Sequence, residues 1–218
     1  MSLQLILGSA GSGKSYDLYQ YMIRHSIEEP EKRHFLLVPE QFTMQTQKTI
    51  AAIHPRHSTA SLDIVSFERL AYRVFEELGF RNYTLLDDMG KSMILRKVAQ
   101  EREQEFHLFR KNLKKPGFIT QLKSMLSEFY QYGVGLEQLK MVSGQMEGRP
   151  LLKYKLEDLS VAYEGFAEKL SADAITAEEV LIRLCEMAQG SRLLKGSVMA
   201  LDGFTGFTPV QNKLLGEL

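Results

Sequence analysis

The sequence predicts an α/β fold in which a parallel sheet carries helices on both faces and is interrupted by an inserted all-helical subdomain. Three observations lead to this prediction. An apolar run, a glycine-rich loop and a helix follow one another at the start of the chain, and strand-like and helix-like segments then alternate up to residue 78. After about a hundred residues of helical pattern, a further strand follows. Such alternation is typical of parallel sheets, because their strands need crossover helices.

The first of these segments contains a phosphate-binding motif. Residues 3–7 are short and apolar, which predicts a buried strand, and residues 16–23 fit a helix. Between them, residues 8–15 (GSAGSGKS) match the phosphate-loop pattern G-x-x-x-x-G-K-[ST] without a mismatch. The candidate nucleotide-binding residues are therefore Gly8, Ser9, Ala10, Gly11, Ser12, Gly13, Lys14 and Ser15.

The chemistry of this motif depends on the geometry of strand, loop and helix. Backbone N–H groups of the loop and of the helix N-terminus form a concave site for anionic oxygens. Lys14 would reach the β- and γ-phosphates of a nucleotide such as ATP, and the Ser15 hydroxyl would ligate Mg²⁺. Two alternatives remain open, namely a plain glycine turn with a solvated lysine and a vestigial loop that has lost its ligand.

Further strands of the sheet are predicted at residues 34–38, 61–65 and 197–202, where short apolar runs end in turn residues. Thr43 and Ser66 are expected to be the N-caps of the helices that follow the second and third strands. We expect helices on both faces of this sheet, as in other parallel sheets.

The middle of the chain shows no convincing strand pattern. Apolar residues recur at helical spacing over residues 118–130, and Asp87 and Thr176 are candidate helix caps. We therefore expect a helical insertion subdomain at residues 84–192. The core would then be discontinuous, made of residues 1–83 and 193–218, and we expect it to be truncated at its C-terminus.

The last predicted strand ends in a second candidate site residue. Asp202 directly follows an apolar strand, as in a Walker B strand, whose aspartate holds Mg²⁺. The alternative is an ordinary aspartate that starts a turn before Gly203. Gly203 stands where a water-activating glutamate often follows, so the sequence predicts nucleotide binding with weak or absent hydrolysis. Glu40, at the end of the second strand, could substitute as a base, or make a local hydrogen bond or face DNA.

Composition limits the remaining function classes. Basic and acidic residues balance at 27 each, so any DNA binding must come from a local surface. The densest basic run, residues 110–115, fits a solvated loop or a contact with DNA or a partner. A single cysteine excludes an internal disulfide framework and fits a reducing compartment, and no apolar run reaches the length of a membrane span. No signal peptide is recognised, so we expect a cytoplasmic protein.

Several segments in a fixed order resemble one family. After the phosphate loop come VPEQFT at residues 38–43, IVSFERLAY at residues 64–72 and LDGFTGFTPVQ at residues 201–211. Together they resemble the N-terminus of the AddB subunit of the AddAB helicase–nuclease, over essentially the whole chain. The resemblance implies a RecA-like P-loop NTPase core of the superfamily 1 helicase type, with ATP bound by residues 8–15 and Mg²⁺ held by Ser15 and Asp202.

The resemblance also implies a role in the processing of DNA double-strand breaks for recombination. The DNA contacts would come from Gln41, Thr43, Ser66 and Arg69, although helix capping explains Thr43 and Ser66 equally well. The partner would be an AddA-type motor subunit. A nuclease domain with an iron–sulfur cluster would lie outside this chain, since one cysteine cannot hold a four-cysteine cluster.

Two other hypotheses compete with this one. The chain could be an active P-loop NTPase that uses an unrecognised base. It could instead be a scaffold that binds DNA or a partner subunit and leaves its loop empty.

Overall fold

The computed structural model describes residues 3–80, 84–170 and 174–218 and shows an α/β protein with small parallel sheets and many helices. The chain divides into two compact units. The first, here called the sheet unit, comprises Met1–Phe80, Arg183–Phe207 and Leu214–Leu218. The second, here called the helical unit, comprises Arg81–Ile182 and Thr208–Lys213.

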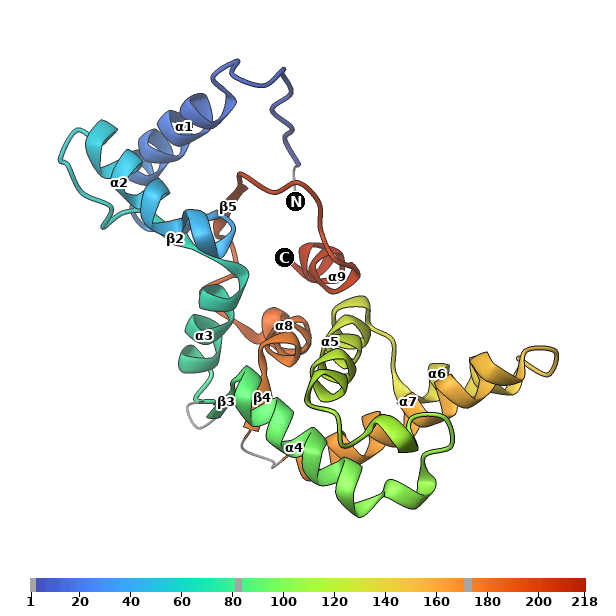
Figure 1. Cartoon of the computed structure of the whole chain (residues 1–218). Helices are drawn as coiled ribbons and strands as arrows, with labels where there is room; N and C mark the ends of the chain where they lie inside the picture. The colour runs from blue at the N-terminus through green and yellow to red at the C-terminus, as the bar shows by residue number, and fades with distance from the viewer. Residues whose placement is uncertain (1–2, 81–83, 171–173) are drawn as a thin grey trace. The chain divides into compact units, whose positions relative to one another are not determined.

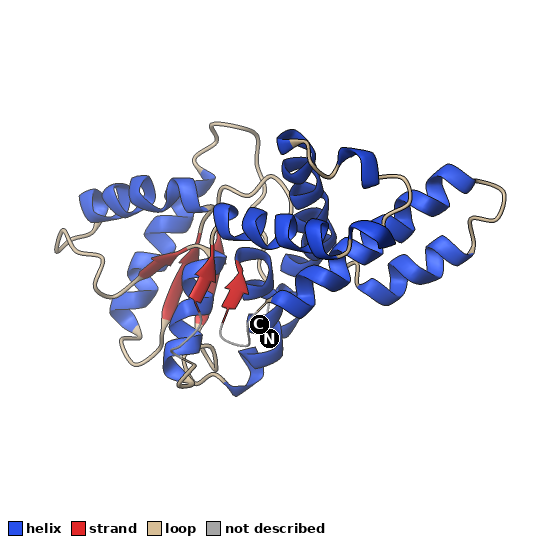
Figure 2. Cartoon of the chain, turned by 60° about the horizontal axis from the view of Figure 1, so that its bottom comes forward, coloured by secondary structure: helices blue, strands red, loops and turns tan. Residues whose placement is uncertain are grey.

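Three parallel strands form the centre of the sheet unit, in the order β2-β1-β5. They are β1 (His34–Leu37), β2 (Asp63–Val65) and β5 (Val198–Leu201). Figure 2 draws these strands, like those of the other unit, in red. The strands predicted near residues 34–38, 61–65 and 197–202 are thus present. Their register aligns Leu36 with both Ile64 and Ala200.

Both faces of the central strand β1 are buried. Two neighbouring helices, α1 (Lys14–Glu28) and α2 (Thr43–Ile53), contribute apolar side chains to the cluster that contains Leu36 (Figure 1). On the opposite side of β1, Phe35 and Leu37 are also fully buried. A strand that is apolar on both faces is typical of a parallel sheet between covering layers.

The strand predicted at residues 3–7 is wrong. Residues 3–9 form neither helix nor strand, and Figure 1 draws them as a coil. Leu3 is 88% exposed and Leu7 is 85% exposed, so the apolar run is not part of the core. The physical reason is that an apolar run shows only a preference for burial, whereas a strand also needs a neighbouring strand to complete its hydrogen bonds.

Of the two helix caps predicted in the sheet unit, Ser66 is confirmed and Thr43 is wrong. Helix α3 (Phe67–Glu77) begins as predicted, because the Ser66 hydroxyl accepts the N–H of Arg69 at 3.3 Å. The N-cap prediction for Thr43 is wrong by one residue, since Phe42 is the N-cap of α2. The Thr43 hydroxyl instead donates to the carbonyl oxygen of Glu40 at 2.9 Å, within the short 3₁₀ helix Glu40–Phe42.

The helical unit is built around an apolar core of its own, which includes Leu95, Phe106, Leu122, Leu159 and Phe166. Four helices lie within this unit: α4 (Asp88–Glu101), α5 (Pro116–Tyr132), α6 (Leu136–Gly144) and α7 (Pro150–Lys169). Two more begin in it, α8 (Ala177–Met187) and α9 (Pro209–Glu217), and it also contains 3₁₀ turns at Glu103–Glu105 and Arg110–Asn112. A further 3₁₀ turn, Ala188–Gly190, lies in the sheet unit. Within the described ranges, every helix is too short or too polar to cross a bilayer.

The prediction that the inserted block is entirely helical is wrong. Strands β3 (Thr84–Leu86) and β4 (Ala174–Thr176) form a parallel pair in the helical unit. Three residues are too few to display the alternation that identifies a strand, and the partner strand is far away in the sequence. The two predicted caps that follow these strands are confirmed. Asp87 accepts the N–H of Gly90 at 2.7 Å, and Thr176 accepts the N–H of Glu179 at 3.3 Å.

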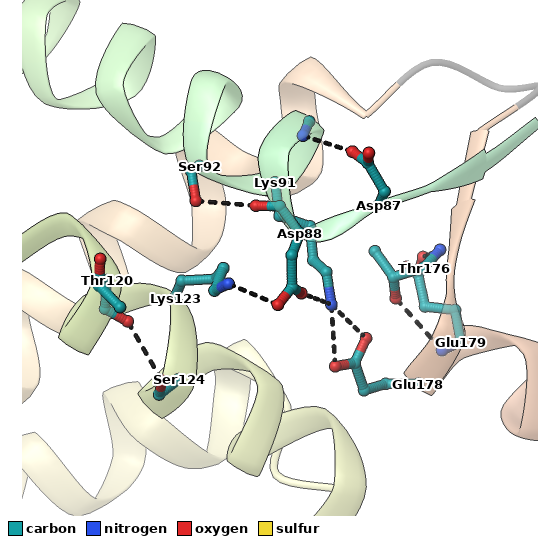
Figure 3. Close-up of polar contacts among 11 residues, drawn as sticks. Asp87, Asp88, Lys91, Ser92, Thr120, Lys123, Ser124, Thr176, Glu178 and Glu179 are labelled. Carbon is teal, nitrogen blue, oxygen red and sulfur yellow. Dashed lines mark hydrogen bonds and ion pairs between the residues drawn. The ribbon is translucent and has the colours of Figure 1, made fainter.

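A cluster of ion pairs joins three helices of this unit (Figure 3). Lys91 on α4 lies 3.1 Å from Glu178 on α8 and 3.3 Å from Asp88. Lys123 on α5 lies 2.8 Å from the other oxygen of Asp88. The cluster ties the first turn of α4 to α5 and to the first turn of α8, beside the β3–β4 pair.

Candidate nucleotide-binding site

The phosphate loop has the backbone that its glycines allow. Gly11 and Gly13 have φ values of 75° and 88°, in the left-handed region that other residues avoid. Gly13 directly precedes Lys14, the first residue of α1, and no described side chain caps this end of the helix. The N–H groups of the first helical turn therefore have no partner within the helix and can receive an anion.

Lys14 extends back along its own loop. Its ammonium group donates hydrogen bonds to the carbonyl oxygens of Gly8 at 2.8 Å and Ser9 at 2.6 Å. These contacts hold a positive charge over the loop whose N–H groups would bind phosphate. A bound phosphate would compete with the two carbonyls for this ammonium group, and a charge-assisted bond to phosphate is the stronger one.

Asp202 reaches the same helix from the far end of the sequence. It directly follows β5 and extends the ladder, because its N–H donates to the carbonyl of Leu37 at 3.0 Å. The Ser15 hydroxyl donates to one carboxylate oxygen of Asp202 at 2.9 Å, across 187 residues of sequence. The Tyr19 hydroxyl donates to the other oxygen at 2.7 Å. Residues 8–15 and Asp202 therefore lie together in the sheet unit.

Tyr19 is a site residue that the sequence analysis missed. It follows Ser15 by one helical turn, so the two side chains share one face of α1, and this spacing was the available signal. The ring is 9% exposed and packs with Met22 and Ile23 in the core under the sheet. Burial, and then the hydrogen bond to Asp202, raise the pKa of Tyr19 to about 12, so its hydroxyl is a protonated donor at neutral pH.

The oxygen atoms of Ser15 and Asp202 are suitable ligands for a Mg²⁺ ion that binds together with a nucleotide. Mg²⁺ prefers oxygen ligands and is usually held by one or two carboxylates together with phosphates and waters. Ser15 supplies a hydroxyl oxygen and Asp202 a carboxylate, and the two are already in contact. Within the described residues, no group of three or more His, Cys, Asp or Glu side chains could hold a metal ion. The donor set therefore suits a metal ion shared with phosphate oxygens.

The backbone conformation at the position after Asp202 favours glycine. Gly203 has a φ of 78°, a conformation that costs other residues about 1–2 kcal/mol. The alternative base, Glu40, is engaged by Arg69, whose Nε and terminal nitrogen lie 3.1 Å and 2.9 Å from one carboxylate oxygen. Both side chains are about half exposed. The carboxylate of Glu40 is therefore oriented towards Arg69.

Four predicted DNA-contact residues lie where β1 and β2 end. Gln41 is exposed, and Arg69 makes the ion pair with Glu40. Thr43 and Ser66 are both buried. Ser66 caps α3, as the alternative of helix capping predicts, whereas the Thr43 hydroxyl bonds to the carbonyl of Glu40 and does not cap α2. In the helical unit, the basic run at residues 110–115 is a 3₁₀ turn and loop in which Lys114 lies 3.6 Å from Glu103.

An aromatic cluster fixes the loop that follows Asp202. Phe204 lies 5.4 Å from Phe67 and 5.1 Å from Phe207, measured between ring centroids. Phe67 is the first residue of α3, so these contacts hold the loop against the end of β2. This cluster was not predicted from the sequence, although all three phenylalanines lie in the segments that carry the family resemblance.

Residues 5–218 match the family model described as "ADDB, N-terminal", so the chain belongs to the AddB N-terminal family. Among its relatives, the B subunit of the ATP-dependent helicase/deoxyribonuclease of Lachnoclostridium phytofermentans is 45% identical over the whole chain. Proteins of the same name are 34% identical in Alkaliphilus metalliredigens and 35% identical in Desulforamulus reducens. The chain spans 19% of the length of each of these relatives.

Proposed function

We propose that this chain is the N-terminal, helicase-like, ATP-binding part of a helicase–nuclease subunit that processes DNA double-strand breaks in recombinational repair. The names of its relatives support this proposal, because they describe an ATP-dependent helicase and deoxyribonuclease. The proposal includes an AddA-type partner, since each relative is named as one subunit of a larger enzyme, and a cytoplasmic location with its DNA substrate.

The observation that carries the nucleotide part is the hydrogen bond between Ser15 and Asp202. It brings the hydroxyl at the end of the phosphate loop to the carboxylate at the end of β5. ATP would bind with its phosphates against the N–H groups of the loop and its β- and γ-phosphates near Lys14. Bound Mg²⁺ would neutralise charge on the phosphate oxygens, held by Ser15 and Asp202.

Hydrolysis is proposed to be weak or absent. Gly203 offers no side chain to orient water, and its backbone conformation disfavours a glutamate. Glu40 is paired with Arg69. The protein would therefore use ATP as a bound ligand, and its partner subunit would supply the motor.

Calorimetric titration of the purified protein with ATP and Mg²⁺ tests nucleotide binding. The Lys14→Ala variant should bind about tenfold more weakly or worse, because it loses charge-assisted hydrogen bonds to phosphate. Lys48→Ala, which removes an exposed lysine from α2, is the matched control and should bind like the wild type. Absence of ATP binding by the wild type would contradict the proposal and favour an empty scaffold. Phosphate release above the Lys14→Ala background would favour an active NTPase.

Fluorescence anisotropy with a single-stranded oligonucleotide tests the DNA contact. Arg69→Ala should weaken binding severalfold and reduce its salt dependence, since one phosphate contact is lost. Arg73→Ala is the matched control, because Arg73 lies one turn later on α3 and pairs with Asp63 at 2.6 Å. Equal effects of the two substitutions would contradict a specific role for Arg69.

A further inference from the structure

We infer that Tyr19 is a positioning residue, which holds the carboxylate of Asp202 in place for the Mg²⁺ of a bound nucleotide. The inference rests on the proposed function and adds to the phosphate-loop motif a residue that lies outside it. Its basis is the hydrogen bond of 2.7 Å from the Tyr19 hydroxyl to Asp202.

The two carboxylate oxygens of Asp202 have different partners. One accepts from Ser15, the residue that would itself ligate the metal, and the other accepts from Tyr19. If the Ser15 oxygen held a metal ion, its hydrogen bond to Asp202 would be altered. The bond from Tyr19 uses the other carboxylate oxygen, so Tyr19 would still orient the carboxylate.

Tyr19 is itself held firmly. Its ring is buried with Ile50 of α2 and Leu36 of β1 in the core of the sheet unit. Tyr19 therefore links α1, through its packing against α2, to the end of β5. Partners of this kind behind a metal ligand typically change metal affinity or activity by 10–100-fold when they are removed.

A purely structural role for the hydroxyl predicts a different result. If Tyr19 only completed the packing, its removal would change ATP affinity equally with and without the metal ion. A positioning role changes the coupling between the two ligands instead, because coupling is the effect of one ligand on the affinity of the other. The ratio of the ATP dissociation constants in EDTA and in Mg²⁺ measures this coupling.

The experiment measures that ratio by calorimetry for the wild type, Tyr19→Phe and Tyr21→Phe. Tyr19→Phe keeps the buried ring, and Tyr21→Phe removes a hydroxyl from an exposed tyrosine on the same helix. We expect Tyr19→Phe to lower the ratio about tenfold while its affinity in EDTA stays within about twofold of the wild type. Tyr21→Phe should leave the ratio unchanged. Thermal unfolding of each variant checks that it is folded.

Asp202→Asn provides the limiting case, since it removes the carboxylate charge and should abolish the effect of Mg²⁺. A ratio for Tyr19→Phe equal to that of the wild type would overturn the inference and leave the proposed function intact. A parallel loss of affinity in EDTA and in Mg²⁺ would also overturn it, in favour of packing alone. A wild type that binds no ATP in either buffer would instead contradict the proposed function, and the inference would fall with it.

Discussion

The side-chain nitrogen of Lys91 lies 3.1 Å from a carboxylate oxygen of Glu178, and both side chains are about nine-tenths buried. The pair joins the first turn of α4 to the first turn of α8, across 87 residues of sequence (Figure 3). Removing two charges from water is costly, so such a pair is tolerated only when its geometry and hydrogen bonds are good. The contact therefore fixes which elements of the helical unit meet.

Lys91→Met should destabilise the protein by about 3 kcal/mol, because it leaves the Glu178 carboxylate buried without its cation. Urea unfolding measures this free energy. Lys97→Met, on an exposed position of the same helix, is the control and should change it by less than about 0.5 kcal/mol. The double variant Lys91→Met with Glu178→Leu should regain much of the lost stability. A single variant no weaker than its control would contradict this role for the pair.

The same carboxylate should make stability depend on pH. Burial alone would raise the pKa of Glu178, but hydrogen bonds from Ser127, from the backbone and from Lys91 hold it below its ordinary value of 4.5. The unfolded chain therefore takes up this proton more readily than the folded one. The stabilisation is complete above about pH 5 and is lost as the pH falls through 4.5 towards the folded value. Unfolding free energies of the wild type and Glu178→Gln should therefore differ more at about pH 6 than at about pH 3.5. A difference independent of pH would contradict the assignment.

Asp158→Asn should cost about 2–3 kcal/mol of stability. Asp158 is fully buried on α7, and its two oxygens accept the N–H groups of His107, Leu108 and Phe109 at 2.6–2.8 Å. An asparagine turns an amide nitrogen towards at least one of these donors and leaves it without an acceptor. Denaturant unfolding measures the loss, with Glu157→Gln on the same helix as the control. Equal effects of the two changes would contradict an anchoring role for Asp158.

Gly203→Glu should reduce stability by about 1–2 kcal/mol without giving ATP turnover. The cost follows from the φ of 78°, which a glutamate adopts only with strain. Gly206→Glu is the matched control, because Gly206 lies in the same loop without a positive φ, and a Cβ added there would meet nothing within 4 Å. Thermal unfolding and a phosphate-release assay are the measurements. Turnover by Gly203→Glu would show that only the base was missing.

The sequence by itself determined the parts whose signals are local. The glycine turn before α1, the buried strands near residues 34–38 and 61–65, and the caps at Ser66, Asp87 and Thr176 were all predicted from neighbouring residues. Local signals suffice there because a cap or a glycine turn is made by residues within one turn of each other. The order of the quoted segments also indicated the AddB family, which the matching family model confirms.

Tertiary structure decided what depends on distant partners. The apolar run at residues 3–7 pairs with no strand among the described residues, whereas the three-residue strands β3 and β4 pair despite showing no pattern. Tyr19, Asp158 and Lys91 likewise depend on distant partners, since each side chain meets at least one group 49 or more residues away. A hydrophobic pattern in the sequence indicates only that a side chain prefers burial. The packing of the whole unit determines which group that side chain contacts, because the hydrophobic effect is non-directional whereas hydrogen bonds and ion pairs are directional.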